Sequence, residues 1–220
     1  MLFLASNSPR RKQLLAMGGW DFKVVPAQID ESPLASETPK ECALRLAKGK
    51  AYSASKELGK DGIVVAADTV VVENDKQSEQ IMGKPRDARE AEEMLLRLRG
   101  ATHKVYTALA FLHVRDNILL TDLCESEVTM RNYSNAEIID YIATGDPLDK
   151  AGAYAIQHCL FRPVEKLVGC YANVMGLPLC HLSRSLMSLG LQTGVDLPTV
   201  CQSKLGYSCS VYSMVLCREL

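Results

Sequence analysis

The sequence predicts an α/β protein built on a mixed β-sheet, and three observations lead to this fold class. Short apolar runs of strand length alternate with amphipathic runs of helix length along most of the chain. Three Ser/Thr/Asp-x-x-Glu sequences mark helix starts, because each can form a capping box. Two β-rich runs, 103–114 and 117–131, flank a polar turn and predict an antiparallel hairpin, which a purely parallel sheet would not contain.

The first strand and helix carry the clearest local signals. Residues 2–5 are apolar and lead to Ser8, a residue suited to cap a helix. Pro9 follows, and its restricted backbone angle suits the first helical position. The helix over 9–17 then ends at a glycine pair, since glycine readily adopts the backbone that follows a helix.

A short strand, a long helix and a buried strand come next. The run 22–25 predicts the strand. The sequence Thr38-Pro39-Lys40-Glu41 is a capping box with proline at the first helical position, and it starts a helix that extends to about residue 58. Residues 62–72 form an almost continuous apolar run, which is typical of a strand buried on both faces.

The remaining capping boxes, at 87–90 and 134–137, predict two more helices. We expect the first to end at Gly100 and the second near Gly145. A last clear helix is predicted over 178–189.

Beyond Gly190 the pattern fails. Residues 191–220 contain Pro198, Gly206, three cysteines and an alternating run near 207–215. We expect either an edge strand or a disordered tail there, and no function follows from the segment.

The composition limits the possible partners. The chain has 220 residues, of which 47% are hydrophobic and 23% are charged, so it is expected to fold around a sizeable core. Its formal net charge is −1, which produces no global field for nucleic acid or a membrane surface. We therefore expect neither as a partner.

The cysteines and the N-terminus predict a cytoplasmic protein with mostly free thiols. None of the eight cysteines forms a C-x-x-C pair, and none has zinc-ligand spacing with the four histidines. The N-terminus lacks the apolar core of a signal peptide, and no apolar run approaches the ~20 residues that span a bilayer. These features favour a reducing compartment.

An anion site is predicted at the start of the first helix. Arg10, Arg11 and Lys12 all lie in its first turn, where the helix dipole is already positive. Free backbone N–H groups and two guanidinium groups at one place form a site for phosphate. The alternative is an exposed basic turn that water solvates.

Two acids and two lysines are further candidates. Asp68 interrupts the most apolar run of the chain, so we expect it to face a cleft, a cation or a metal, or else to be a turn residue. Glu31 lies in a polar loop, where a solvated acid is the ordinary case. Lys84 lies in a Gly/Pro loop, and Lys50 lies late in its helix, where a cation suits the dipole.

Gln157 ends an apolar run with an amide that could read a base edge, although a strand-end glutamine in water explains it equally well. Familiar nucleotide and hydrolase motifs are absent: the chain has no Walker A sequence, no G-x-G-x-x-G, no H-E-x-x-H and no G-x-S-x-G. The residues alone indicate metal-assisted phosphate chemistry and do not name a substrate.

Taken together, these blocks resemble the Maf family of nucleoside triphosphate pyrophosphatases. The resemblance covers about residues 2–190, in family order. Its blocks are Leu4 to Arg11, Ile29 to Glu31, Arg45 to Ala47 with Lys50-Ala51, Ala67 to Val70, Gly83 to Asp87, Pro147 to Gln157 and Val174 to Leu179. We accordingly divide the chain into a Maf-like domain, 1–190, and a C-terminal extension, 191–220.

The resemblance implies an elongated mixed β-sheet flanked by helices, with an active-site cleft between two lobes, as in the related inosine triphosphate pyrophosphatases. It also implies hydrolysis of a nucleoside triphosphate to the monophosphate and pyrophosphate. Within the family, the type that acts on dTTP and UTP resembles this chain at Arg10, Thr69 and Gln157. The type that acts on 7-methyl-GTP has tryptophan in place of the first of these residues and glutamine in place of the second.

The resemblance also implies roles for the candidate residues. Ser8, Arg10 and Arg11 would bind the triphosphate, and Lys50 and Lys84 would neutralise the leaving pyrophosphate. A divalent cation, Mg²⁺ or Mn²⁺, would be held by Glu31 or Asp68.

Asp68 would activate the attacking water, while Thr69 and Gln157 would face the base. A homodimer is possible.

The chain departs from the family pattern at 158–163 and at Gly169-Cys170-Tyr171. Two alternatives stay open, namely a pyrophosphatase for purine or modified nucleotides and a non-catalytic nucleotide-binding regulator of cell division.

Overall fold

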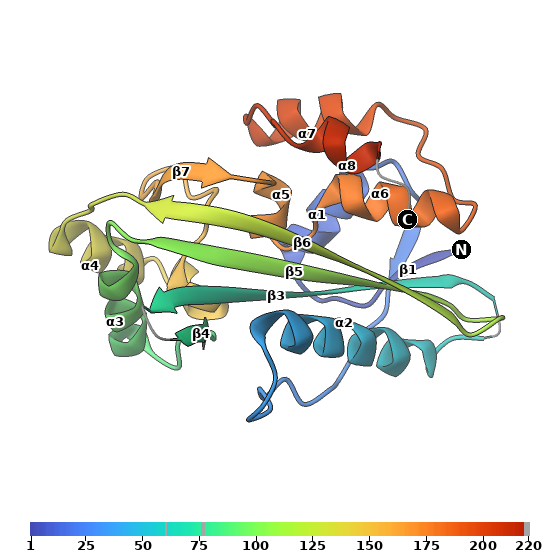
Figure 1. Cartoon of the computed structure of the whole chain (residues 1–220), viewed down its shortest axis with the longest axis horizontal. Helices are drawn as coiled ribbons and strands as arrows, with labels where there is room; N and C mark the ends of the chain where they lie inside the picture. Colours follow the sequence, from blue (N-terminus) through green and yellow to red (C-terminus); the bar gives the residue numbers. More distant parts are fainter. Residues whose placement is uncertain (60, 76–77, 218–220) are drawn as a thin grey trace.

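The computed structural model describes residues 1–59, 61–75 and 78–217, and it confirms a mixed α/β fold (Figure 1). Its sheet has seven strands in the order β2-β1-β3-β5-β6-β7, with β4 paired to β3 outside this path. The strands are β1 (Leu2–Leu4), β2 (Phe22–Val24), β3 (Ile63–Asp75), β4 (Ser78–Met82), β5 (Thr102–His113), β6 (Ile118–Met130) and β7 (Val164–Val168). β1 pairs in parallel with β2 and β3, while all other pairings are antiparallel, as the predicted hairpin requires.

Helices cover both faces of this sheet (Figure 1). They are α1 (Pro9–Met17), α2 (Pro39–Ser55), α3 (Ala88–Leu98), α4 (Asn135–Ala143), α5 (Tyr171–Val174), α6 (Leu179–Ser188), α7 (Leu197–Leu205) and α8 (Tyr212–Leu216), with short 3₁₀ turns η1 (Asp146–Asp149) and η2 (Ala151–Ala153). None of the helices in the described ranges is both long and apolar enough to cross a membrane.

The central strand β3 sends alternate side chains to opposite faces of the sheet. Val64 and Ala66 pack in the cluster formed with α2, whereas Val65 and Ala67 pack in the cluster formed with α1 and α6. This period of two is the ordinary geometry of a strand, and burial on both faces explains the continuous apolar run. The same alternation sends the neighbouring polar residues Asp68 and Thr69, further along β3, to different faces of the sheet.

Two apolar clusters lie towards opposite ends of the long strands (Figure 1). One gathers around β1, α1 and α6, and the other around α3, α4 and η2. This arrangement agrees with the two lobes that the family resemblance implies.

The predicted capping boxes are confirmed at Thr38 and Ser134. The third is only half formed. The Asp87 carboxylate accepts from the Glu90 backbone N–H at 2.9 Å, but the Glu90 carboxylate accepts instead from the backbone and side chain of Arg86. The guanidinium beside it competes for the carboxylate that would have completed the box.

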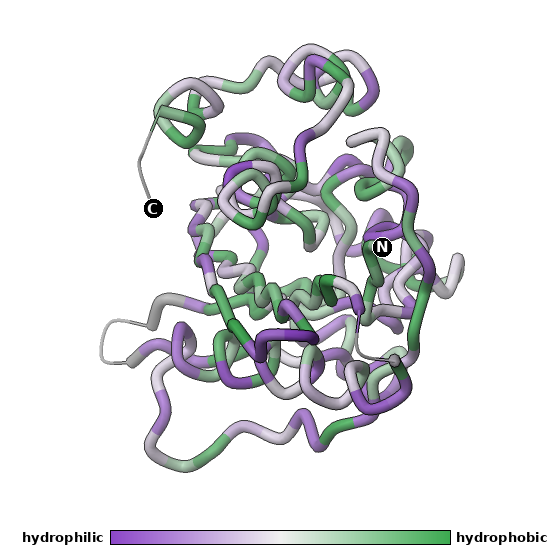
Figure 2. Tube along the Cα trace, turned by 90° about the vertical axis from the view of Figure 1, so that its right-hand side faces the viewer, coloured by the Kyte–Doolittle hydropathy of each residue, from purple (hydrophilic) through white to green (hydrophobic). Residues whose placement is uncertain are grey.

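The extension 191–220 is neither an edge strand nor a disordered tail over its described residues, so that prediction is wrong. It forms α7 and α8, which lie as the outermost layer above the sheet (Figures 1 and 2). Pro198 stands in the first turn of α7, after the capping residue Asp196, where proline is favoured and does not break a helix. Leu197 and Val215 are buried, so two apolar anchors dock the extension.

β7, which lies at the edge of the sheet opposite β2, is a strand that the sequence did not predict. It is short, and its two charged residues, Glu165 and Lys166, are adjacent and both exposed. Its pairing with β6, and not its own pattern, makes it a strand.

One buried histidine makes the fold sensitive to acid. His103 is fully buried, its Nε2 lies 2.8 Å from the Tyr154 hydroxyl, and its Nδ1 has no partner in the described residues. Burial lowers the pKa of His103 to about 4. The unfolded chain therefore binds a proton at His103 more tightly than the folded chain does. The stability that neutral His103 contributes is fully present above pH ~6.5 and is lost as the pH falls towards 4.

We predict that the His103→Gln variant loses less of its free energy of unfolding between pH 7 and pH 5 than the wild type, by about 2 kcal/mol. Denaturant unfolding at both pH values measures this. His113→Asn is the control, because that imidazole is partly exposed beside Asp116. An equal pH dependence in wild type and His103→Gln would contradict the account.

Candidate active site

A cleft of about 600 Å³ crosses the sheet beside β3. β1 pairs with β3 only as far as Val65, and β4 begins its pairing at Val71. Between these neighbours, residues 66–70 pair only with β5 within the part of the chain that the structure describes, so one edge of the strand is left open. Side chains from both faces of the sheet therefore meet in the same cleft.

The cleft is lined mainly by the start of α1, the middle of α2 and β3, the end of β4, and the segments around η2 and after α5. The charged residues among its lining are Arg10, Arg11, Glu31, Lys50, Asp68, Lys84, Asp149 and Lys150. Cations outnumber carboxylates in this set, although the whole chain carries a net charge of −1. The cleft thus concentrates positive charge locally.

Lys50 joins two carboxylates at the centre of the cleft. Its Nζ lies 2.6 Å from Asp68 Oδ1 and 2.6 Å from Glu31 Oε1. The Lys50 and Asp68 side chains are 10% and 9% exposed, whereas the Glu31 side chain is 51% exposed. A buried ammonium needs such partners, because an unpaired buried charge is costly.

The position of Asp68 follows from the alternation along β3. An even-numbered residue of this strand faces α2, where Lys50 lies. The other carboxylate oxygen of Asp68, Oδ2, accepts no hydrogen bond from a described residue. Oδ1 is therefore held by the lysine, and Oδ2 is available in the cleft to accept a hydrogen bond.

The Glu31 carboxylate stays ionised at neutral pH. Burial acts to raise its pKa, but the hydrogen bond and charge of Lys50, with the charges of Lys84 and Arg11, lower it below the ordinary value. The Glu31 carboxylate beside Lys50 is consequently negative when the cleft is empty.

Arg11 is fixed on the other face of β3. Its Nε donates to the Gly176 carbonyl at 2.9 Å, and its Nη2 donates to Thr69 Oγ1 at 3.1 Å. Thr69 in turn lies 2.9 Å from Thr107 Oγ1. Burial lowers the pKa of Arg11, while the nearby charge of Asp68 opposes that shift.

Gly176 makes room for this guanidinium. Its φ is +103°, and a Cβ there would lie 3.2 Å from Thr69 Oγ1 and 3.3 Å from Arg11 Nε. A larger residue would be strained by its backbone and would crowd both groups. Glycine is thus needed where α5 ends against the cleft.

The start of α1 keeps its backbone donors free. Ser8 occupies the cap position, but its side chain makes no capping hydrogen bond. Arg10 and Lys84 line the cleft without an ion pair or hydrogen bond to any described residue. These free donors and cations, together with the free N–H groups of a helix start, can bind a polyanion.

Lys150 is a cleft residue that the sequence reasoning missed. Its Nζ contacts Asp149 Oδ1 at 2.5 Å and Asp146 Oδ1 at 2.9 Å, and its side chain is 8% exposed. A sequence signal for Lys150 does exist, because the residue lies next to Asp149 within the block from Pro147 to Gln157. A lysine beside acids in that block is a candidate cleft residue.

Gln157 does not line the cleft. It is exposed, in a turn that follows η2 and Tyr154. Of the site residues predicted from sequence, the structure brings together Ser8, Arg10, Arg11, Glu31, Lys50, Asp68, Thr69 and Lys84, and leaves Gln157 outside.

Two carboxylates of the cleft are candidates to hold a divalent cation together with a substrate. In the described ranges, no three or more His, Cys, Asp or Glu side chains are grouped so as to hold a metal ion. Glu31 and Asp68 nevertheless lie close together, since both contact one lysine nitrogen. Mg²⁺ commonly uses one or two carboxylates and takes its other ligands from water and phosphate, so this pair suits a shared cation.

Comparisons with known proteins identify the family of this chain. A family model described as Maf-like protein matches residues 1–189. A dTTP/UTP pyrophosphatase of Citrifermentans bemidjiense is 43% identical over 189 residues, which cover 86% of this chain and 95% of that protein. A protein of the same name from Clostridium botulinum strain Kyoto is 40% identical over 193 residues, covering 86% and 97%.

Among solved structures, a nucleoside-triphosphatase / dITP/XTP pyrophosphatase of Mycobacterium abscessus is 13% identical, with a TM-score of 0.41, and the match covers 86% of this chain and 97% of that one. The match to the family model and the identity with the sequence relatives show that the chain belongs to the Maf family.

Proposed function

We propose that this protein hydrolyses dTTP and UTP to the nucleoside monophosphate and pyrophosphate. The observation that carries the proposal is the Lys50 ammonium held between Asp68 and Glu31 in a cleft that also presents free cations. Relatives 40–43% identical bear the name dTTP/UTP pyrophosphatase, which supports the same substrates here.

The triphosphate binds to the positive side of the cleft. Arg10, Lys84 and the free N–H groups of α1 supply donors that no described residue uses. Arg11 is already oriented by Gly176 and Thr69, so its remaining N–H groups meet a phosphate without further ordering.

Asp68 activates the attacking water. Its Oδ1 is bound by Lys50, which fixes the carboxylate, and its Oδ2 is free to accept a proton from water. The water attacks the α-phosphorus, the bond to the bridging oxygen breaks, and pyrophosphate leaves with its negative charge stabilised by Lys50 and Lys84.

A divalent cation, Mg²⁺ or Mn²⁺, bound with the substrate would neutralise charge on the phosphates, and Glu31 and Asp68 are the carboxylates that would hold it. This role is compatible with the ionised state of Glu31 described above.

The nucleobase of the substrate is proposed to lie beyond Thr69, along the apolar lining formed by Val70, Val71 and Met82. Gln157 can pair with the O4 and N3–H edge of uracil or thymine only if its turn moves towards the cleft, because its side chain is exposed outside it. Base reading by Gln157 therefore stays a prediction.

A reducing compartment, the cytoplasm, is proposed as the place of action. All eight cysteines are free thiols in the structure, which supports this proposal.

We predict that Asp68→Asn lowers kcat by 10²–10⁴-fold, the ordinary cost of losing a general base, while binding of a non-hydrolysable UTP analogue changes little. Steady-state kinetics and calorimetric titration measure the two quantities. Glu165→Gln is the control, because Glu165 is an exposed carboxylate on β7, away from the cleft lining. Turnover of Asp68→Asn at the wild-type rate would remove Asp68 from the mechanism.

We predict that Arg11→Lys lowers kcat/KM by about 10–100-fold, because lysine cannot reproduce the planar fork that contacts Gly176 and Thr69 while meeting a phosphate. Arg89→Lys, at a surface ion pair with Glu93, is the control and should act as wild type. A kinetically silent Arg11→Ala variant would remove Arg11 from substrate binding and leave it only its structural contacts with Gly176 and Thr69.

We predict that dTTP and UTP exceed CTP in kcat/KM, and that all three exceed ATP, GTP and 7-methyl-GTP. Pyrophosphate release across this panel, with inosine triphosphate included, measures the order. A preference for any purine would favour the purine or modified-nucleotide alternative. Binding without release for every nucleotide would favour the non-catalytic regulator.

A further inference from the structure

Arg11 is one member of a closed ring of hydrogen bonds. On one side its Nε donates to the Gly176 carbonyl at 2.9 Å, and the Gly176 N–H donates to the Asn173 carbonyl at 2.9 Å. On the other side its Nη2 donates to Thr69 Oγ1 at 3.1 Å, and Thr69 Oγ1 lies 2.9 Å from Thr107 Oγ1. Thr107 Oγ1 closes the ring, because it donates to the same Asn173 carbonyl at 2.9 Å. Both sides therefore end at one backbone carbonyl.

The direction of the hydrogen bonds in this ring is fixed. A carbonyl oxygen only accepts, so its contact with Thr107 uses the single hydroxyl proton of that residue. Thr107 Oγ1 must then accept from the Thr69 hydroxyl, and Thr69 Oγ1 accepts from the guanidinium. Both lone pairs of the Asn173 carbonyl are occupied, one by Thr107 and one by the Gly176 N–H. The Thr69 proton is therefore directed at Thr107 and not at the cleft.

Thr107 acts from behind the wall of the cleft. Its side chain is completely buried on β5 and lies outside the described cleft lining, which does include Thr69 and Arg11. Thr69 and Thr107 are direct partners in the pairing of β3 with β5, so the register of these strands places the two hydroxyls side by side. A buried hydroxyl is costly without hydrogen bonds, and both partners of Thr107 belong to the ring.

The carbonyl on which the ring closes is held in place by its own side chain. Asn173 is fully buried on α5, and its Nδ2 donates to the Val105 carbonyl at 3.0 Å and to Ser126 Oγ at 2.9 Å. These bonds join α5 to β5 and β6, so the carbonyl keeps its distance from Thr107.

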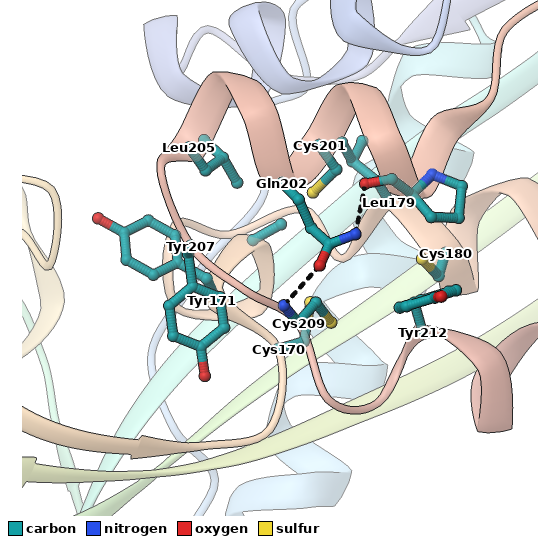
Figure 3. Close-up of a pocket in the computed structure, with 12 residues that line it drawn as sticks. Cys170, Tyr171, Leu179, Cys180, Cys201, Gln202, Leu205, Tyr207, Cys209 and Tyr212 are labelled. Atoms are coloured by element: carbon teal, nitrogen blue, oxygen red, sulfur yellow. Dashed lines mark hydrogen bonds between the residues drawn. The ribbon is translucent and has the colours of Figure 1, made fainter.

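On another side α5 packs against the C-terminal extension (Figure 3). The Tyr171 ring at the start of α5 lies 5.3 Å from the Tyr207 ring of the extension. The pocket between these elements encloses about 20 Å³, room for roughly one water molecule, so an organic ligand does not separate them. α5 is therefore a fixed support for the ring.

We propose that Thr107 is a positioning residue for the triphosphate: it fixes the Arg11 guanidinium through Thr69, so that the other N–H groups of Arg11 are aimed at phosphate before the substrate binds. A guanidinium carries five N–H groups, of which the ring uses two. Holding this planar group in one orientation removes part of the entropy cost of binding an anion. This inference rests on the proposed function, in which Arg11 binds the triphosphate.

The test removes the Thr107 hydroxyl and keeps the shape of the side chain. Thr107→Val leaves the Thr69 hydroxyl without its acceptor and loosens the guanidinium, so kcat/KM for UTP should fall about tenfold, the size of one buried hydrogen bond. The Kd of inorganic tripolyphosphate, measured by calorimetry without a metal, should rise by a similar factor. Thr107→Ser keeps the hydroxyl and should restore both quantities to within about threefold of the wild type.

Two comparisons separate positioning from stability. Tyr133→Phe removes another buried hydroxyl, which donates to the Leu95 carbonyl at 2.7 Å away from the cleft lining, and should change neither quantity. In an Arg11→Lys background Thr107→Val should have less than about a twofold effect, because the group through which it acts is already absent. Circular dichroism checks folding, and Thr107→Ala takes the same measurements if the valine variant does not fold.

A nuclear magnetic resonance measurement of the ring needs no ligand. The Nε–H of Arg11 is assigned by the loss of its signal in Arg11→Lys. Its exchange with solvent should be about tenfold faster in Thr107→Val than in the wild type and in Thr107→Ser, because the ring that shields it is open.

Failure of the proposed function gives a different result from failure of this inference. If the wild type binds tripolyphosphate but releases pyrophosphate from no nucleotide, the proposed function fails, and the tripolyphosphate and exchange measurements still decide the role of Thr107. The inference is overturned if the wild type does not bind tripolyphosphate, or if Thr107→Val leaves its Kd and the Nε–H exchange unchanged. It is also overturned if the loss is equal in the Arg11→Lys background or persists in Thr107→Ser.

Discussion

The ionic contact of Lys50 with Asp68 and Glu31 is the interaction on which the cleft depends. It connects α2 to the middle of β3 and to the loop before α2, three parts of the chain that form different walls. Asp68 needs Lys50, because removing the lysine would leave this buried carboxylate without its partner among the described residues. In the proposed mechanism the same three groups serve as the base, the cation that stabilises the leaving group and a second carboxylate.

The second constraint is the open edge of β3 between β1 and β4. A strand normally sends neighbouring side chains to separate faces of a sheet, so Asp68 and Thr69 would be isolated from each other in a fully paired sheet. Since residues 66–70 lack a neighbour on one side, the cleft reaches both faces. Asp68 then meets Lys50 below the sheet, while Thr69 meets Arg11 above it.

Much of the fold and most of the site were predictable from local chemistry. Capping residues such as Thr38 and the polar interruption at Asp68 act within a few residues, so the sequence shows them directly. Features that depend on residues far apart in the sequence could not be predicted from it. Lys150 is distinguished only by its contacts with Asp146 and Asp149, and β7 is a strand only because β6 pairs with it. Gln157 lies outside the cleft because of the turn that holds it, which the sequence does not show. The extension is helical because Asp196 caps α7 and Pro198 lies in the first turn of that helix, a relation that the residue types alone do not show.

The most direct measurement of the central claim is a structure of the protein with an α,β-imido analogue of UTP and a divalent cation. The account predicts that the α-phosphorus lies beside the free oxygen of Asp68, that Lys50 contacts a phosphate oxygen, and that the outer phosphates lie against Arg10 and the start of α1. A triphosphate bound away from this place, with the contacts of Lys50 to Asp68 and Glu31 unchanged and no phosphate beside them, would contradict it.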